Sequence, residues 1–157
     1  MKIHHYVSCF VVRPSSCGSH EFLQVLRVRG KYMGETWQLV TGGIEDGETA
    51  WHAALRELRE ETGLLPGEFY QVDVINTFYL AKTDSISMSP MFCAMVEAGA
   101  QVMLNHEHTD FRWVPRAEIE SRTMWPGERA ALKEVCAEIL DNGPAKPYLK
   151  IEIPRAS

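Results

Sequence analysis

The sequence predicts one α/β domain in which a mixed sheet packs between helices, an α/β/α sandwich. Segments rich in β-branched and aromatic residues lie on both sides of one amphipathic helix, and a second amphipathic helix comes near the end of the chain. The length of 157 residues suits a single domain with a substantial core. A hydrophobic content of 45% and a charged content of 24% are ordinary globular values. We therefore expect one domain over residues 1–157.

The N-terminal part of the chain predicts a β-hairpin. Residues 6–12 and 21–28 are rich in Val, Phe and Tyr, and a turn cluster at residues 15–19 separates them. Residues 30–35 predict a loop. Residues 37–40 then form a short apolar segment that enters a glycine-rich turn at Gly42.

The central helix has two distinct faces. Its apolar stripe repeats at i, i+3, i+4 and i+7 and consists of Trp51, Ala54, Leu55 and Leu58. Three acidic residues share another face at i, i+3 and i+4, namely Glu57, Glu60 and Glu61. Gly63 follows as a helix-stop signal.

The second half predicts further strands and the last helix. Residues 71–81 and 90–96 predict two strands, and the polar residues 82–89 predict the hairpin loop between them. Residues 111–114 predict a short strand, which places Glu107 in the loop before it. An apolar stripe predicts a C-terminal helix at about residues 128–140, and residues 148–153 are a candidate short strand.

The three stacked carboxylates point to a cation. Like charges on one helical face repel each other, and Arg56 can neutralise only part of them. A hard divalent cation takes oxygen ligands such as carboxylates. For an isolated E-x-x-E-E pattern, the competing interpretation is a solvated acidic face with Arg56 and Arg59 as ordinary partners.

The wider spacing favours the metal interpretation. Residues 42–64 match G-x5-E-x7-R-E-U-x-E-E-x-G-U, where U is apolar, without a departure. The fixed positions hold Gly42, Glu48, Arg56, Glu57, Leu58, Glu60, Glu61, Gly63 and Leu64. This segment resembles the signature box of the Nudix hydrolases. The resemblance implies the same sandwich with a loop-helix-loop box, and an Mg2+- or Mn2+-dependent hydrolase of nucleoside diphosphates linked to another group.

The resemblance also implies roles inside the box. Glu57, Glu60 and Glu61 would hold the metal, and the Gly42 carbonyl is a plausible further oxygen ligand. Arg56 and Glu48 would orient those ligands, because outer partners fix inner ones.

A second acidic candidate lies outside the box. In Nudix hydrolases a Glu in the loop before a strand such as 111–114 often reaches the metals or acts as a base, so the resemblance raises Glu107 above an ordinary solvated residue. His106 and His108 flank Glu107. We expect them to be exposed or to contact the metal ligands rather than the metal itself, because a hard cation prefers oxygen. The proton acceptor is either Glu61 or Glu107.

Several residues are candidates for substrate contact. Arg27, Arg29 and Lys31 lie close to the stretch that enters the box and would contact phosphate, with solvated strand-end charge as the alternative. Trp37 would stack on a nucleobase or fill the core. Tyr79 lies near the position where diadenosine polyphosphate hydrolases often carry a Tyr, although a strand Tyr is usually a packing residue.

Composition limits the partners. The formal net charge of −5 and the pI of about 5.7 disfavour binding to a nucleic-acid polymer, so a small nucleotide-like phosphate is expected. No apolar run approaches membrane-spanning length. The four cysteines show no metal-like spacing and predict reduced thiols in the cytoplasm. The oligomeric state, monomer or homodimer, stays open.

The segment W-Q-L-V-T-G-G and the H-E-H segment are most similar to nucleoside triphosphate and dihydroneopterin triphosphate pyrophosphohydrolases. The resemblance therefore implies hydrolysis of such a triphosphate to the monophosphate and pyrophosphate. The alternatives are a diadenosine polyphosphate hydrolase and a catalytically silent nucleotide-binding sensor.

Overall fold

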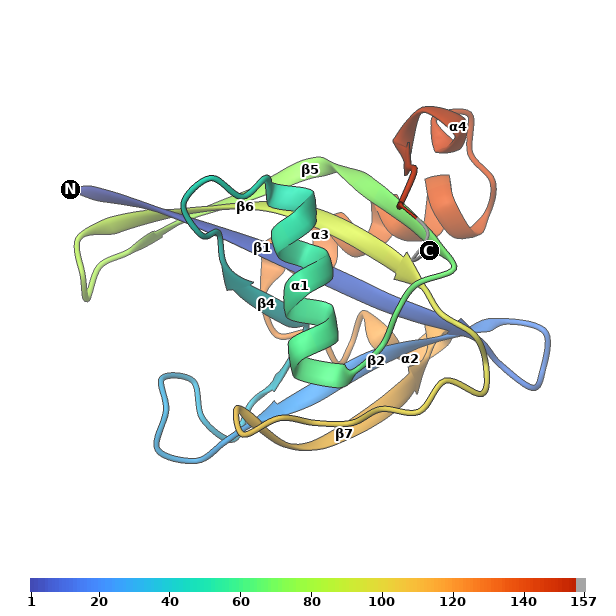
Figure 1. Ribbon diagram of the computed structural model, residues 1–157, viewed down its shortest axis with the longest axis horizontal. Helices are drawn as coiled ribbons and strands as arrows, with labels where there is room; N and C mark the ends of the chain where they lie inside the picture. Colours follow the sequence, from blue (N-terminus) through green and yellow to red (C-terminus); the bar gives the residue numbers. More distant parts are fainter. Residues whose placement is uncertain (155–157) are drawn as a thin grey trace.

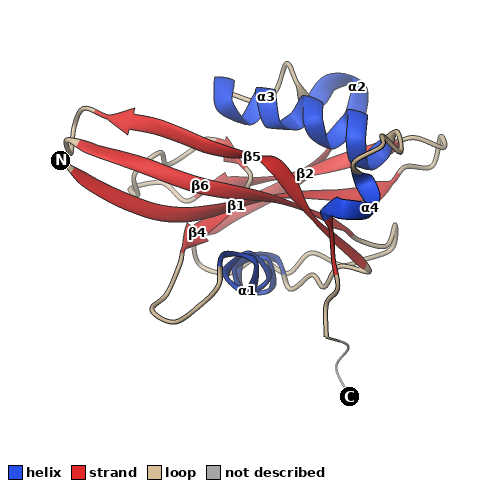
Figure 2. Cartoon of the chain, turned by 90° about the horizontal axis from the view of Figure 1, so that it is seen from above, coloured by secondary structure: helices blue, strands red, loops and turns tan. Residues whose placement is uncertain are grey.

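The computed structural model describes residues 1–154, and these form one sheet between two helical layers. The helix α1 (Ala50–Thr62) covers one face, while α2 (Arg116–Ile119) and α3 (Pro126–Glu134) cover the other (Figure 2). The predicted α/β/α arrangement is confirmed.

The sheet is mixed and is built around β1. Its strands within residues 1–154 are β1 (Lys2–Pro14), β2 (His20–Arg27), β3 (Trp37–Gln38), β4 (Val40–Gly43), β5 (Glu68–Leu80), β6 (Ser85–Met95), β7 (His108–Pro115) and β8 (Lys150–Ile151). β1 pairs antiparallel with β2 and β4 and parallel with β6. β5 lies beyond β6 and β7 lies beyond β2, both antiparallel (Figure 1). The predicted N-terminal hairpin is confirmed.

The core has one apolar cluster on each face of the sheet. Successive residues of β1 alternate between them: Val7 and Val11 pack with α1, whereas Phe10 and Val12 pack with α3. Leu58 of α1 is 0% exposed and belongs to the first cluster. The apolar stripe of α1 therefore fixes which face of this helix turns away from the sheet.

Local signals set both ends of α1. The side chain of Thr49 accepts a hydrogen bond from the His52 N–H at 3.3 Å and caps the N-terminus. Gly63 ends the helix at φ 71°, and its N–H donates to the Arg59 carbonyl at 2.8 Å. Glycine adopts this left-handed conformation without a steric cost.

The predicted hairpin loop at residues 82–89 is wrong. β6 already begins at Ser85, and residues 81–84 alone make the turn. Ser85 and Ser87 alternate with Ile86 and are buried, so these serines belong to the inner face of a strand. Ser89 continues this row, and its Oγ lies 3.1 Å from the Oγ of Ser8. The polar composition predicted a loop because small buried hydroxyls resemble turn residues in sequence.

The C-terminal elements also differ from the expected bounds. α3 begins at Pro126, a favoured residue for the first helical turn. The rest of the predicted helix is a π-helix, η1 (Val135–Leu140). The candidate strand at 148–153 is shorter than expected. Its first two residues belong to the short helix α4 (Lys146–Leu149), and only the two residues of β8 form a strand. No helix within residues 1–154 is long and apolar enough to cross a membrane.

We expect the Leu58→Ala variant to lose about 2–5 kcal/mol of unfolding free energy, because it opens a cavity beneath α1. Leu65→Ala is the matched control, since Leu65 is 70% exposed, and should change stability by less than about 0.5 kcal/mol. Urea unfolding measures both. Equal losses would show that Leu58 does not anchor α1.

Candidate active site

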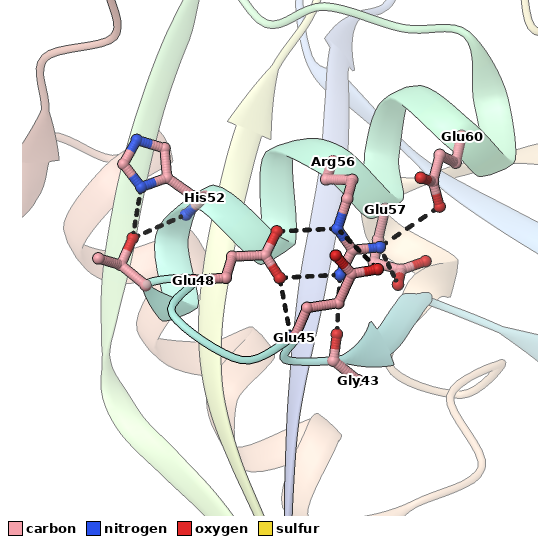
Figure 3. Close-up of polar contacts among 8 residues, drawn as sticks. Gly43, Glu45, Glu48, His52, Arg56, Glu57 and Glu60 are labelled. Carbon is pink, nitrogen blue, oxygen red and sulfur yellow. Dashed lines mark hydrogen bonds and ion pairs between the residues drawn. The ribbon is translucent and has the colours of Figure 1, made fainter.

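Arg56 connects the loop before α1 to the acidic face of the helix (Figure 3). Its Nε and Nη2 donate to the two oxygens of Glu48 at 2.8 and 3.0 Å. Its Nη1 donates to Glu57 Oε1 at 2.7 Å and to Glu60 Oε2 at 3.3 Å. Nη2 also donates to the Gly43 carbonyl at 2.9 Å. One guanidinium therefore fixes the relative positions of β4, the loop and α1.

The opposite charges in this network stabilise each other's ionised forms. Hydrogen bonds from Arg56 lower the pKa of Glu48 to about 2. In turn, Glu48 and Glu57 raise the pKa of the guanidinium. Arg56 is thus charged throughout the working pH range and stays paired with Glu48.

The carboxyl group of Glu57 lies directly against the backbone of Gly42. A Cβ atom at residue 42 would overlap the Glu57 side chain. β4 runs beside β1 here, with Gly42 opposite Val7, so the backbone has little room to retreat. The glycine at this place in the box is therefore needed for close approach of Glu57.

A second group of polar side chains, two of them buried, lies at the C-terminal end of α1. Glu61, Glu107 and His108 each offer a ligand atom, and these atoms lie within 4.8 Å of one another. Glu61 is only 2% exposed and His108 only 5%. His108 opposes Arg27 across β2 and β7, and α1 packs with β2 in one apolar cluster, so His108 lies near the C-terminal end of α1. The Glu107 carbonyl also accepts a hydrogen bond from the Val28 N–H at 2.9 Å.

Burial makes this group electrostatically unfavourable without a cation. Desolvation, together with Glu57 and Glu107, raises the pKa of Glu61 to about 9, and Arg27 opposes the rise only weakly. Desolvation also raises the pKa of Glu57. Burial and then Arg27 lower the pKa of His108, so its imidazole is neutral at pH 7.

The donor set fits a divalent cation. Glu61 Oε2 and His108 Nδ1 are buried and have no hydrogen-bond partner within residues 1–154. Orphaned buried polar atoms are rare and are costly without a partner. Carboxylate oxygens are the ligands that Mg2+ and Mn2+ prefer, and a neutral imidazole can also coordinate a metal.

The remaining candidates near the box are Glu60, Gly42 and Arg27. Glu60 is largely exposed and contacts Arg56. The Gly42 backbone lies beside Glu57, as described above. Arg27 is half-buried and lies close enough to Glu61 and His108 to shift the pKa of each.

The other substrate-contact candidates are not members of the acidic cluster. Arg29 and Lys31 are exposed in the loop after β2. One face of the Trp37 ring is covered by the Arg112 guanidinium, 4.1 Å from the ring centroid. Tyr79 lies near the β5–β6 turn, where its hydroxyl donates to Asp84 at 3.0 Å.

Sequence reasoning missed two features of the site. His106 is exposed, as expected, but the buried His108 shares the acidic cluster. The Gly43 carbonyl accepts a hydrogen bond from Arg56, whereas the sequence pattern points only to Gly42 as a backbone ligand. The strand signal at residues 111–114 did not extend to His108, where β7 begins.

Comparison with known proteins identifies the family. The NUDIX domain profile matches residues 3–135, which is most of the chain. The chain belongs to the Nudix hydrolase family. The nucleoside triphosphatase NudI of Enterobacter sp. (strain 638) is 30% identical over 111 residues, covering 66% of this chain and 78% of the relative. A Nudix hydrolase of this kind is a pyrophosphohydrolase that acts on nucleotide-like substrates.

Two further similarities add less about function. The octanoyltransferase of Myxococcus xanthus is 35% identical over 118 residues, which cover 73% of this chain but only 32% of that protein. The chain thus spans about a third of that relative, and octanoyl transfer is not assigned to it. The C. elegans Ap4A hydrolase has a TM-score of 0.71 at 21% identity, covering 85% of this chain and 96% of the other. That similarity confirms the fold.

In the presence of a chelator, we expect stability to fall as pH rises from about 5 to 9. The folded pKa of Glu61, about 9, lies above the ordinary 4.5, so folding favours the protonated carboxyl and this contribution disappears as the group ionises. Glu61→Gln resembles the protonated form and should flatten the dependence. Thermal midpoints across this pH range measure it, with Glu97→Gln, at an exposed loop carboxylate, as the control. Parallel curves for wild type and Glu61→Gln would contradict the assignment.

Proposed function

We propose that the protein hydrolyses a phosphoanhydride bond of a nucleoside triphosphate-like substrate, either an NTP or dNTP or dihydroneopterin triphosphate. The products would be the monophosphate and pyrophosphate. The observation that carries this proposal is the group of Glu61, Glu107 and His108, of which Glu61 and His108 are buried, beside a complete box. The similarity to a protein named nucleoside triphosphatase supports the triphosphate class.

The acidic residues supply the metal ligands in this proposal. Glu57, Glu60 and Glu61 would hold Mg2+ or Mn2+, with the Gly42 carbonyl and Glu107 as additional oxygen donors. A bound divalent ion neutralises phosphate oxygens and increases the acidity of a coordinated water. Arg56 holds Glu57 and Glu60 in place, and Glu48 holds Arg56.

The two candidates for the proton acceptor differ in burial. Glu61 is 2% exposed, and as a metal ligand its carboxylate oxygens would be occupied by the cation. Glu107 is less buried than Glu61 and lies in the same cluster. We assign Glu107 as the group that removes the proton from the attacking water, with Glu61 as the alternative.

Basic and aromatic side chains would bind the rest of the substrate. Arg27 lies beside the cluster and would contact a phosphate, with Arg29 and Lys31 in the adjoining loop as further cations. Trp37 has one ring face against Arg112, so a nucleobase would stack on the other face. Tyr79 is the second aromatic candidate.

The proposed partner is a small nucleotide rather than a nucleic-acid polymer, since the net charge of −5 gives no general attraction for a polyanion. All four cysteines are free thiols, which supports the proposed cytoplasmic location.

A panel of NTPs, dNTPs, dihydroneopterin triphosphate, dinucleoside polyphosphates and ADP-ribose tests the proposal. Each is incubated with Mg2+ or Mn2+, and the products are identified by chromatography. We expect pyrophosphate release from a triphosphate and none in excess chelator. Preference for a diadenosine polyphosphate would support the alternative hydrolase, and binding without turnover would support a sensor. Full activity in chelator would exclude the metal mechanism.

Glu107→Gln should lower kcat at least about tenfold, because removing a general base typically costs 10²–10⁴ in rate. If Glu107 acts mainly as a ligand, the loss appears instead as a higher Mg2+ requirement. Steady-state kinetics across an Mg2+ titration separate these effects. Glu97→Gln, at an exposed loop carboxylate, is the control and should match wild type. Unchanged kcat, KM and Mg2+ requirement would leave Glu61 as the base.

A further inference from the structure

The sheet face beneath α3 changes from apolar to polar where the strands continue beyond this helix toward the N-terminus (Figure 2). Phe10 of β1 and Met91 of β6 belong to the apolar cluster under α3. Two residues earlier in each strand, Ser8 and Ser89 lie on the same face, and their Oγ atoms are 3.1 Å apart. Ser87 continues this row, and all three serines are buried. Polar groups therefore replace the apolar core at this end of the sheet.

Three aromatic side chains surround the buried serines and are partly open to solvent. Tyr6 of β1 is 40% exposed, Phe78 of β5 is 44% exposed, and Trp125, directly before α3, is 48% exposed. Tyr6 lies two residues from Ser8, and Phe78 lies opposite Ser87, so both rings are on the face that α3 covers. Aromatic side chains gathered around a few polar groups are typical of sites for small ligands.

The first turn of α3 brings a carboxyl group to this region. A Cβ atom at Gly127 would overlap the side chain of Asn76, so the start of the helix lies directly against β5. Glu128 follows Gly127 and precedes the buried Leu132 by four residues. Residues four apart on a helix lie on the same face. The Glu128 side chain is therefore directed toward the sheet, beside Asn76.

The half-buried Glu128 carboxyl has no partner in the described part of the chain. Burial alone raises its pKa to about 7, since no hydrogen bond or charge within residues 1–154 acts on it. An acidic residue in the first turn gains a little from the helix dipole. Burying a carboxyl group without a hydrogen bond, however, is unfavourable for stability. Ionisable groups that carry such a cost are typical of functional sites.

We propose that Glu128, Asn76 and Trp125 bind the planar heterocyclic ring of the substrate, a purine or a pterin. The Glu128 carboxyl accepts a hydrogen bond from a ring or amino N–H, and the Asn76 amide offers both a donor and an acceptor to the same ring edge. The Trp125 ring stacks on the heterocycle. Trp37 lies on the same face of the sheet, because Leu39, two residues later, belongs to the cluster under α3, so its proposed stacking role is compatible with this site.

β4 connects this site to the acidic residues. Gly42 lies against Glu57 on the α1 side of the sheet. The next residue, Gly43, faces the other side, where it pairs with Tyr6 and where a Cβ atom would meet no heavy atom within 4 Å. β4 pairs only with β1 within residues 1–154, so a ligand can pass around its outer edge. The phosphates would then lie at the acidic residues, which rests on the proposed function, and the ring would lie beneath α3.

Isothermal titration calorimetry with ligands that differ only in the ring tests this assignment. The probes are AMP, GMP, dihydroneopterin monophosphate and ribose 5-phosphate, each with Mg2+. At least one ring-bearing probe should bind the wild type more tightly than ribose 5-phosphate. Glu128→Ala should weaken binding of that probe about tenfold and leave ribose 5-phosphate unchanged, because one hydrogen bond to the ring is lost. Glu128→Gln keeps an acceptor oxygen and should retain most of the affinity.

Glu134→Ala is the matched control, because Glu134 is also on α3 but six residues later, on a different side of the helix. It should bind every probe as the wild type does. The proposal is overturned if no ring-bearing probe binds the wild type more tightly than ribose 5-phosphate, or if Glu128→Ala weakens all probes equally or none. Ring binding without turnover of any triphosphate would instead contradict the proposed function and leave the ring site intact.

Thermal unfolding distinguishes ligand binding from a structural role of Glu128. Without ligand, Glu128→Ala should melt at the wild-type temperature or above it, because the substitution removes a carboxyl group that has no partner within residues 1–154. Adding the ring-bearing probe should raise the melting temperature of the wild type more than that of Glu128→Ala. A lower melting temperature without ligand, together with an equal response to the probe, would assign Glu128 to the fold instead.

Discussion

The burial of the Glu61 carboxyl among other acidic groups is the constraint on which the site depends. Leu58 is fixed in the core, and a residue three positions later on a helix lies on nearly the same side. The packing that holds α1 against the sheet therefore also pulls Glu61 out of water. Its Oε2 has no hydrogen-bond partner in the described part of the chain, and desolvation raises its pKa. A cation bound there would relieve this cost, so the proposed metal binding would be coupled to folding.

Arg56 divides the acidic residues into two groups with different electrostatics. It pairs directly with Glu48, Glu57 and Glu60, so these carboxylates are at least partly neutralised. Glu61 has no such contact and faces Glu107 instead. One arginine thus fixes the geometry of the box while it leaves the Glu61 carboxyl free to bind a cation. Because Arg56 also donates to the Gly43 carbonyl, this arrangement is tied to β4 as well as to α1.

The sequence predicted α1 well because its determinants are local. The spacing of the apolar and acidic residues and the stop at Gly63 all act within a few turns of one helix. The contact of Glu61 with His108 could not be predicted in this way. It depends on the register of β2 against β7, which pairs residues far apart in the chain. The same limit explains β6, because the burial of Ser85 is set by neighbouring strands rather than by its own polarity.

A chain of net charge −5 can bind a polyanionic substrate because its site has a mixed electrostatic pattern. The acidic cluster at the centre would attract a divalent cation, and Arg27 lies beside that cluster without a carboxylate contact within 4.0 Å in residues 1–154. A guanidinium in this position remains available for phosphate oxygens. Cation and arginine together would offset the charge of the phosphates locally, whereas the rest of the acidic surface would repel a long nucleic acid. The distribution of charge, rather than its sum, therefore favours a small phosphorylated ligand.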